Sequence, residues 1–133
     1  SCVQAEIAQM VQQEAGGSIV NTASICGLVA LPHATAYNSA KHGVIGLTKS
    51  AAVEYGPKKI RVNAVCPGFI DTPMLAKGAG ASQEILDGVV RQLPIRRIAD
   101  PSEVADVVAW LMSPHSSYVT GVAMPIDGGW TAQ

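Results

Sequence analysis

The sequence predicts an α/β fold with a parallel sheet, and two observations favour this class. Segments with apolar side chains at helical spacing alternate along the chain with short, partly β-branched segments. In addition, 48% of the 133 residues are hydrophobic and only 14% are charged, a composition typical of a folded chain that excludes a disordered one. The length suits one domain, so we expect a single α/β unit with three parallel strands.

The first part of the chain predicts a helix, a strand and a second helix. Residues 3–15 place apolar side chains at helical spacing, and Gly16 would end this helix because glycine readily adopts the left-handed cap. Residues 18–23 are short and partly β-branched, which predicts a buried strand. After a loop over 24–34, a long alanine-rich helix is expected over 35–55. Its expected apolar stripe consists of Val44, Leu47, Ala51 and Ala52.

The middle of the chain predicts a second strand followed by short helices. Residues 60–66 alternate loosely and are followed by a Pro-Gly pair, where a strand would end. A short helix is expected to begin near Pro73, with Asp71 or Thr72 as its cap. Residues 77–82 are small and lack periodicity, which predicts a mobile loop. The face of the next helix would consist of Ile85, Leu86, Val89, Val90 and Leu93.

The last helix has a clear start signal. Asp100 suits the N-cap, Pro101 the first helical position, and Glu103 can reach back to the cap. Its buried stripe would consist of Val104, Val107, Val108 and Leu111. A third strand is expected near 122–126.

Charge and cysteine usage exclude several classes of partner. Nine basic and ten acidic residues give a formal net charge of −1, so nothing electrostatic favours nucleic acid or an anionic membrane as partner. No apolar run is long enough for a membrane span and no charged-then-apolar segment opens the sequence, so neither a span nor a secretory signal is expected. An odd number of scattered cysteines indicates reduced thiols in a cytoplasmic protein. The histidines lack metal-ligand spacing, so no metal is expected.

Other reactive or charged side chains are expected to be structural. Cys26 and Cys66 fit small buried hydrophobic positions. Arg96 and Arg97 are interpreted as a solvated pair before a helix, and Trp130 as part of a tail that docks on a neighbouring subunit.

Polar side chains are expected to meet at the carboxyl edge of the sheet. Ser24 directly follows the first strand, and a right-handed crossover makes the next helix begin at the same edge. Tyr37 lies in the first turn of that helix, and Lys41 follows one turn later on the same face. The second strand delivers the loop from Pro67 to Thr72 to this edge, where open α/β sheets bind ligands.

A serine, a tyrosine and a lysine together suit proton transfer to or from an oxygen. A phenol is a poor base at neutral pH, because its pKa is about 10. A nearby ammonium stabilises the phenolate, while a serine hydroxyl can bind the substrate oxygen. Such a relay can interconvert an alcohol and a carbonyl only if a nicotinamide cofactor moves the hydride.

At this point a family resemblance is visible. Residues 37–41 read Tyr-Asn-Ser-Ala-Lys, a Tyr-x-x-x-Lys motif. The serine of Val-Asn-Thr-Ala-Ser at 20–24 lies thirteen positions before that tyrosine (37 − 24 = 13). Residues 63–72 contain an Asn-x-x-x-Pro-Gly motif, and residues 121–129 end in Asp-Gly-Gly. Together these segments resemble the short-chain dehydrogenase/reductase family over nearly the whole chain.

The resemblance implies an enzyme with a defined role for each matching residue. Tyr37 would be the catalytic acid or base, Lys41 would support it and bind the nicotinamide ribose, and Ser24 would orient the substrate oxygen. The cofactor, NAD or NADP, would be contacted by Tyr37, Lys41, Pro67, Gly68, Ile70 and Thr72. Residues 74–93 would cover a small-molecule alcohol or ketone substrate.

The resemblance also implies a fold and an assembly. It predicts a Rossmann-like, three-layer α/β/α arrangement in which residues 1–133 form the carboxyl-terminal half of the doubly wound fold. The family's Gly-x-x-x-Gly-x-Gly turn, which binds the pyrophosphate, does not occur in the sequence. A homodimer or homotetramer is expected through the helices at 3–15 and 35–55 and through the carboxyl-terminal helix and strand.

Two alternatives stay open at this point. The chain could be a truncated, inactive relative that acts as an oligomerisation or binding module. It could also be a small α/β binding domain in which the motif occurs by coincidence. A serine hydrolase is not favoured, because residues 23–27 do not form a Gly-x-Ser-x-Gly elbow.

Overall fold

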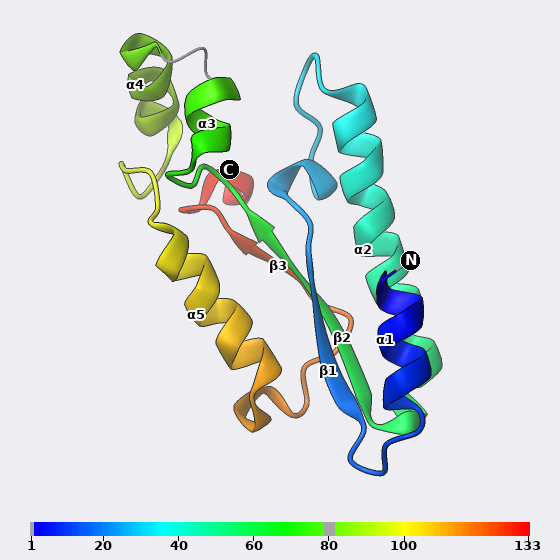
Figure 1. The fold of residues 1–133 in the computed structure, drawn as a ribbon. Coiled ribbons are helices and arrows are strands. Elements are labelled where there is room, and N and C mark those ends of the chain that lie inside the picture. The colour runs from blue at the N-terminus through cyan, green and yellow to red at the C-terminus, as the bar shows by residue number, and fades with distance from the viewer. Residues whose placement is uncertain (1, 79–81) are drawn as a thin grey trace.

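The computed structural model describes residues 2–78 and 82–133 (Figure 1). Its helices and strands are, in chain order, α1 (Cys2–Met10), β1 (Gly17–Thr22), α2 (Thr35–Tyr55), β2 (Ile60–Pro67), α3 (Pro73–Gly78), α4 (Gln83–Gln92), α5 (Pro101–Met112) and β3 (Ala123–Ile126). Four short 3₁₀ helices, which the sequence pattern does not predict, lie at η1 (Ile25–Gly27), η2 (Gly56–Lys58), η3 (Pro114–Ser116) and η4 (Trp130–Ala132).

The three strands form one parallel sheet in the order β1-β2-β3. Gly17 of β1 pairs with Ile60, and the register continues to Thr22 opposite Val65. On the other side of β2, the pairing with β3 begins at Ala64 and Ala123. The predicted α/β fold with a parallel sheet is therefore confirmed.

Helices cover both faces of this sheet (Figure 1). On one face α1 and α2 pack against alternate residues of β1 and β2, as the period of a strand requires. The core here consists of Val3, Ile7, Ile19, Ala51, Ala52, Ile60 and Val62. On the other face α5 lies against β1 and β2. The result is the three-layer α/β/α arrangement that the sequence analysis expected.

The first helix is shorter than predicted. It ends at Met10 instead of residue 15, and the chain then turns towards Gly16, which has a φ of 71°. A Cβ at Gly16 would overlap the Lys59 carbonyl, and the N–H of Gly17 donates to that same carbonyl over 3.2 Å. The turn is needed to bring the start of β1 beside the start of β2, so the helix cannot continue.

The second helix has the predicted bounds but a different buried face. Leu47, expected in the apolar stripe, is 41% exposed, whereas Ile45 and Thr48 are buried together with Ala51 and Ala52. Thr48 is buried because its hydroxyl donates to the carbonyl one turn earlier and accepts from the amide of a β1 side chain. Packing against the sheet, and not hydrophobicity alone, therefore sets the orientation of α2.

The carboxyl-terminal end of α5 is held by side chains from the sheet. The Leu111 carbonyl accepts hydrogen bonds from Ser18 Oγ and Arg61 Nη1, each over 2.9 Å. Arg61 also donates to the carbonyls of Val119 and Ser113, over 3.3 and 3.2 Å. The Leu111 and Ser113 carbonyls lie at the end of α5, where carbonyls lack intrahelical partners, whereas the Val119 carbonyl lies in the segment that leads to β3.

The start of α5 follows the predicted capping box. Asp100 accepts from the N–H of Ser102, and the Glu103 carboxylate accepts from the N–H of Asp100. The Arg97 guanidinium forms two hydrogen bonds of 2.7 Å to Glu103. Arg97 is exposed, as predicted, but it is also paired, because the Glu103 carboxylate binds both its guanidinium and the Asp100 N–H.

The predicted loop at 77–82 is only partly covered by the described residues. Lys77 and Gly78 form the last turn of α3, so the loop prediction is wrong for these two residues. Thr72 is the cap, since its Oγ1 accepts from the N–H of Leu75 over 3.3 Å. Residues 79–81 lie outside the described part of the chain.

Candidate active site

A cavity of about 730 Å³ lies at the carboxyl ends of β1 and β2. The structure brings all seven residues that the sequence analysis selected together around it: Ser24, Tyr37, Lys41, Pro67, Gly68, Ile70 and Thr72. The remaining lining residues are Thr22, Ala23, Leu31, Pro73, Met74, Leu75, Pro101 and Val104. The volume is typical of small-molecule sites, which are mostly apolar with a few convergent polar groups.

Ser24 is held rigidly at the wall of this cavity. It follows β1 as the N-cap of η1, where its Oγ accepts from the N–H of Cys26 over 3.1 Å. Its side chain is only 8% exposed. Gly27 lets η1 approach α2, because a Cβ there would lie 2.7 Å from the Lys41 carbonyl. Since the backbone N–H occupies one acceptor position of the hydroxyl, the Ser24 proton is free to donate to a ligand oxygen.

Tyr37 and Lys41 lie one turn apart at the start of α2. The Tyr37 side chain is 43% exposed, and the Lys41 ammonium lies 5.6 Å from the centre of its ring. Lys41 Nζ also donates to the Thr22 carbonyl over 3.0 Å. The end of β1 therefore holds the ammonium beside the tyrosine ring.

The loop after β2 forms the opposite wall. Gly68 packs so closely on Asp127 that a Cβ there would lie 2.9 Å from the Asp127 Cα. Ile70 forms an isolated parallel bridge with Ala99, which fixes the loop to the segment before α5. The positions of Gly68 and Ile70 are thus set by the chain that follows, which sequence spacing alone does not reveal.

Six lining residues were not selected from the sequence, and three of them come from elements other than those that hold the selected residues. Leu31 comes from the loop before α2, and Pro101 and Val104 come from the first turns of α5. Because α5 precedes the parallel strand β3, crossover geometry also makes it begin at the carboxyl edge of the sheet. That signal could have identified Pro101 and Val104, whereas nothing in the sequence pattern singles out Leu31.

Asn38 fixes Leu31 to the start of α2. Its Nδ2 donates to the Leu31 carbonyl over 2.8 Å, and its Oδ1 accepts from the Leu31 N–H over 3.4 Å. Between them His33 has a φ of 61°, in the left-handed region that side chains other than glycine rarely adopt. The Asn38 side chain therefore clamps a bent loop whose leucine lines the cavity.

The residues around the cavity suit the nicotinamide end of a dinucleotide. A lysine ammonium has three N–H donors, of which one binds the Thr22 carbonyl, so Lys41 has donors left for ribose hydroxyls. Apolar groups of the loop after β2, such as Pro67 and Ile70, provide a surface for a flat ring. The Lys41 donors thus fit the ribose, and the apolar wall fits the nicotinamide ring.

Cys66 and Cys26 lie behind the site and not in it. Both are buried, as predicted, and the three cysteines are free thiols. Burial raises the pKa of the Cys66 thiol, although a hydrogen bond with the Ser24 backbone opposes this rise. A neutral thiol at this position packs as a small hydrophobic group.

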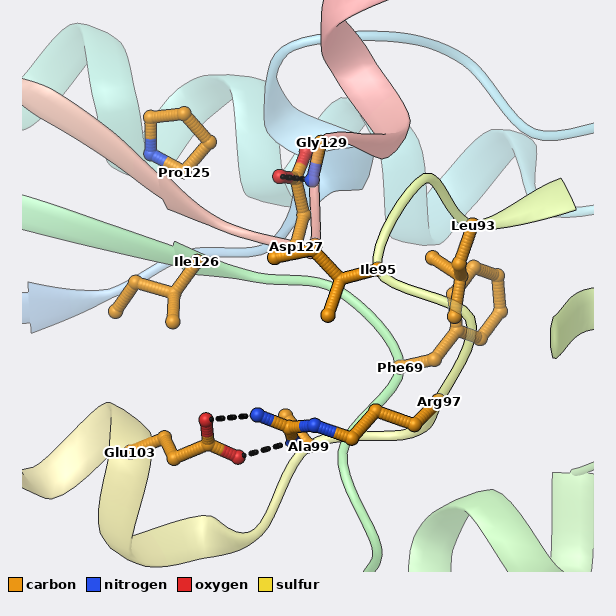
Figure 2. Close-up of a pocket in the computed structure, with 11 residues that line it drawn as sticks. Phe69, Leu93, Ile95, Arg97, Ala99, Glu103, Pro125, Ile126, Asp127 and Gly129 are labelled. Carbon is orange, nitrogen blue, oxygen red and sulfur yellow. Dashed lines mark hydrogen bonds and ion pairs between the residues drawn. The ribbon is translucent and has the colours of Figure 1, made fainter.

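Figure 2 shows a second, smaller cavity, of about 300 Å³, between β3 and the segment before α5. The charged groups on its wall are already paired: Arg97 binds Glu103, and the Asp127 carboxylate accepts from the N–H of Gly129 (Figure 2). Burial favours a higher pKa for the Asp127 carboxyl, but hydrogen bonds from Thr131 and Gly129 outweigh burial and hold this pKa below its usual range. Among the described residues that line this cavity, each charged side chain therefore already has a partner.

Trp130 packs on its own chain. Its ring meets Phe69 edge to face, with 6.1 Å between the ring centres and 76° between the planes. The turn at Gly129 brings the half-buried ring back to the loop after β2, and docking of this tail on a neighbouring subunit stays a prediction.

Within the part of the chain that the structure describes, no three His, Cys, Asp or Glu side chains are grouped so that they could hold a metal ion. Over residues 2–78 and 82–133, no helix combines the length and apolar character needed to cross a bilayer.

Comparison with known proteins identifies the family. A family model described as enoyl-(acyl carrier protein) reductase matches residues 1–131. The γ-butyrolactone 1′-reductase of A-factor type from Streptomyces virginiae is 46% identical over 131 residues, which are 98% of this chain and 51% of that protein. This chain belongs to the short-chain dehydrogenase/reductase family. The cyclohexanol dehydrogenase of an Acinetobacter strain is 48% identical over 118 residues, 89% of this chain and 45% of its own length.

Solved structures of short-chain dehydrogenases have the same fold. A 4-hydroxyisoleucine dehydrogenase complexed with NADH superposes with a TM-score of 0.92 at 32% identity, over 99% of this chain and 54% of that one. A protein from Agrobacterium tumefaciens, named as a 2-deoxy-D-gluconate 3-dehydrogenase with bound NADP, superposes with a TM-score of 0.92 at 32% identity. The match covers 98% of this chain and 53% of that one. The Rossmann-like prediction is confirmed. The chain spans about half the length of the relatives that it matches.

Proposed function

We propose that this chain supplies the proton-transfer and substrate-binding part of an NAD(P)-dependent oxidoreductase that interconverts a secondary alcohol and a ketone. The observation that supports it most is that Ser24, Tyr37 and Lys41, from two different elements, line one cavity with the loop after β2. Relatives named as a cyclohexanol dehydrogenase and a γ-butyrolactone 1′-reductase support the reaction type.

In this proposal Tyr37 handles the proton. When an alcohol is oxidised, its hydroxyl proton passes to Tyr37 Oη, and in the reverse direction the same Oη protonates the carbonyl oxygen. Lys41, 5.6 Å from the ring centre, stabilises the phenolate by its positive charge. Ser24 donates its hydroxyl proton in a hydrogen bond to the substrate oxygen, because its acceptor side already binds the Cys26 N–H.

The cofactor in this proposal is NAD or NADP, which when bound accepts or supplies the hydride. The related structures hold NADH in one case and NADP in the other, so either dinucleotide is compatible. The residues that would hold its nicotinamide end are Tyr37, Lys41, Pro67, Gly68, Ile70 and Thr72.

The test is ketone-dependent oxidation of NADH or NADPH by the purified chain, with two matched variants. Tyr37→Phe removes one hydroxyl from the cavity and should lower the rate by about 10²–10⁴-fold, the usual contribution of a general acid or base. Tyr118→Phe removes the same group from a fully exposed ring elsewhere and should leave the rate unchanged.

Two results would contradict the proposal. Turnover that survives Tyr37→Phe would exclude the tyrosine as the acid or base. A stable oligomer that binds neither NADH nor NADPH in a titration would instead favour the alternative of an inactive oligomerisation or binding module.

The assembly and the compartment stay predictions. A homodimer or homotetramer is supported by apolar side chains that α2 and α5 expose, such as Val53 and Met112, 82% and 58% exposed. Light scattering of the purified chain measures this. The cytoplasm is still predicted from the cysteine pattern alone, and fractionation of the source cells would test it.

A further inference from the structure

The walls of the candidate active site differ sharply in chemistry. The reactive hydroxyls of Ser24 and Tyr37 lie on the part of the lining that β1 and α2 provide. The part contributed by the loop after β2, α3 and α5 is apolar except for Thr72, whose hydroxyl already caps α3. Its apolar side chains include Ile70, Met74, Leu75 and Val104.

Charge is nearly absent from this lining. Among the described residues that line the cavity, Lys41 is the only charged one. Its ammonium is already bound to the Thr22 carbonyl and lies against the Tyr37 ring. Lys77, in the last turn of α3, is exposed and does not belong to the lining. An anionic substrate group would therefore meet either apolar side chains or the one cation on which the tyrosine depends.

Both alternatives disfavour an anionic substrate. Burial of a carboxylate without a partner carries a large desolvation penalty. A carboxylate bound to Lys41 would neutralise the charge that stabilises the Tyr37 phenolate, and would thereby oppose proton transfer.

Resting on the proposed function, we infer that the substrate is a neutral secondary alcohol or ketone with an apolar carbon skeleton and no carboxylate or phosphate. Its oxygen binds at Ser24 and Tyr37. Its skeleton lies against Ile70, Met74 and Val104. The cavity thereby selects against keto acids and sugar phosphates of the same size.

Binding can be measured without turnover through the methionine methyl groups. The chain has four methionines, and only Met74 lines the cavity among the described residues. With methyl-¹³C methionine, cyclohexanone should shift the Met74 signal and leave those of Met10, Met112 and Met124 in place. At the same concentration 4-oxocyclohexanecarboxylate should shift none of them. Equal shifts of Met74 with both ketones, or no shift with either, would overturn the inference.

Turnover provides the second measurement, with the same pair of ketones. For the chain as it is, kcat/KM should be at least about 100-fold lower for the carboxylate than for cyclohexanone. Met74→Lys places an ammonium at the mouth and should narrow this ratio about fivefold, as an exposed ion pair does. Tyr118→Lys adds the same charge at a fully exposed position outside the cavity and should leave the ratio unchanged.

Failure of the inference and failure of the proposed function give different results. If both ketones are turned over equally well and both rates depend on Tyr37, the function stands and the substrate class is wrong. If cyclohexanone shifts Met74 but no ketone is turned over, the binding preference stands and the proposed reaction is wrong.

Discussion

Arg61 offers a quantitative test of how the fold positions α5. Its guanidinium is half-buried on the face of β2 that α5 covers. There it donates to the carbonyls of Leu111, Ser113 and Val119, at the end of α5 and in the segment that leads to β3. Arg61→Met keeps the apolar stem and removes all three hydrogen bonds together with the charge.

The structure sets the size of the effect. None of the three carbonyls loses its last hydrogen-bond partner. The Leu111 carbonyl also accepts from the hydroxyls of Ser18 and Ser116. The Val119 carbonyl also accepts from the Asn63 side chain, and the Ser113 carbonyl from the Ser116 N–H. The desolvation penalty of an unpaired carbonyl therefore does not arise. The 2.9 Å bond should contribute about 1.5 kcal/mol, the lower end for a charged donor, and the bonds of 3.2 and 3.3 Å about 0.5 kcal/mol each. We expect a loss of about 2–3 kcal/mol.

Urea unfolding followed by circular dichroism measures this loss as a lower midpoint at an unchanged slope. Arg91→Met is the matched control, because Arg91 is exposed on α4 and should change stability by less than about 0.5 kcal/mol. Arg61→Lys keeps the charge near the end of the helix and should fall between the two. A loss below about 1 kcal/mol for Arg61→Met, or one equal to that of Arg91→Met, would refute the reasoning.

Two further predictions concern the start of α5 and the wall of the cavity. The Arg97 guanidinium and the Asp100 N–H lower the pKa of Glu103 from an ordinary 4.5 to about 2. A carboxyl whose pKa is lowered in the folded state stabilises the fold at pH values above its unfolded pKa, and this stabilisation is lost as the pH falls towards the folded pKa. The chain should therefore melt at a higher temperature than Glu103→Gln, and this difference should shrink between pH 4.5 and 2. A difference in melting temperature that stays constant over this range would contradict the prediction. Asn38→Ala breaks both bonds to Leu31 and should raise KM for a ketone about fivefold with little change in kcat, since the 2.8 Å bond contributes about 1 kcal/mol and the 3.4 Å bond little. A lower kcat at unchanged KM in steady-state kinetics would show that Asn38 does not act through the wall.

Where local signals agree with long-range packing, the sequence predicts the fold well. The capping box at Asp100 is local chemistry, and it is present as expected. The strands were predicted to within a residue or two, because β-branched runs end at breakers such as Gly68. The errors lie where a distant segment decides. The helix α1 ends early because Gly16 must meet Lys59, and Leu47 is exposed because the sheet sets the rotation of α2.

The same distinction applies to the candidate site. Ser24, Tyr37 and Lys41 were found because a single crossover joins β1 to β2, and its handedness fixes where each residue lies. Leu31 was missed because its position depends on a side-chain clamp, which follows no periodicity. Val104 was predicted only as part of a buried stripe of its helix. In the structure it is half-buried and also lines the cavity.

The two ends of α5 connect the stability of the fold with the shape of the site. Its twelve residues are rigid over about 18 Å, so a side chain that holds one end also fixes the other. Arg61 holds the carboxyl-terminal end at the sheet, while Pro101 and Val104 at the amino-terminal end form part of the cavity wall. A parallel sheet places these two sets of residues at opposite edges, because the helix before a strand runs back across the whole sheet. The wall that would select the substrate is therefore held in place from the edge of the sheet opposite Ser24, Tyr37 and Lys41.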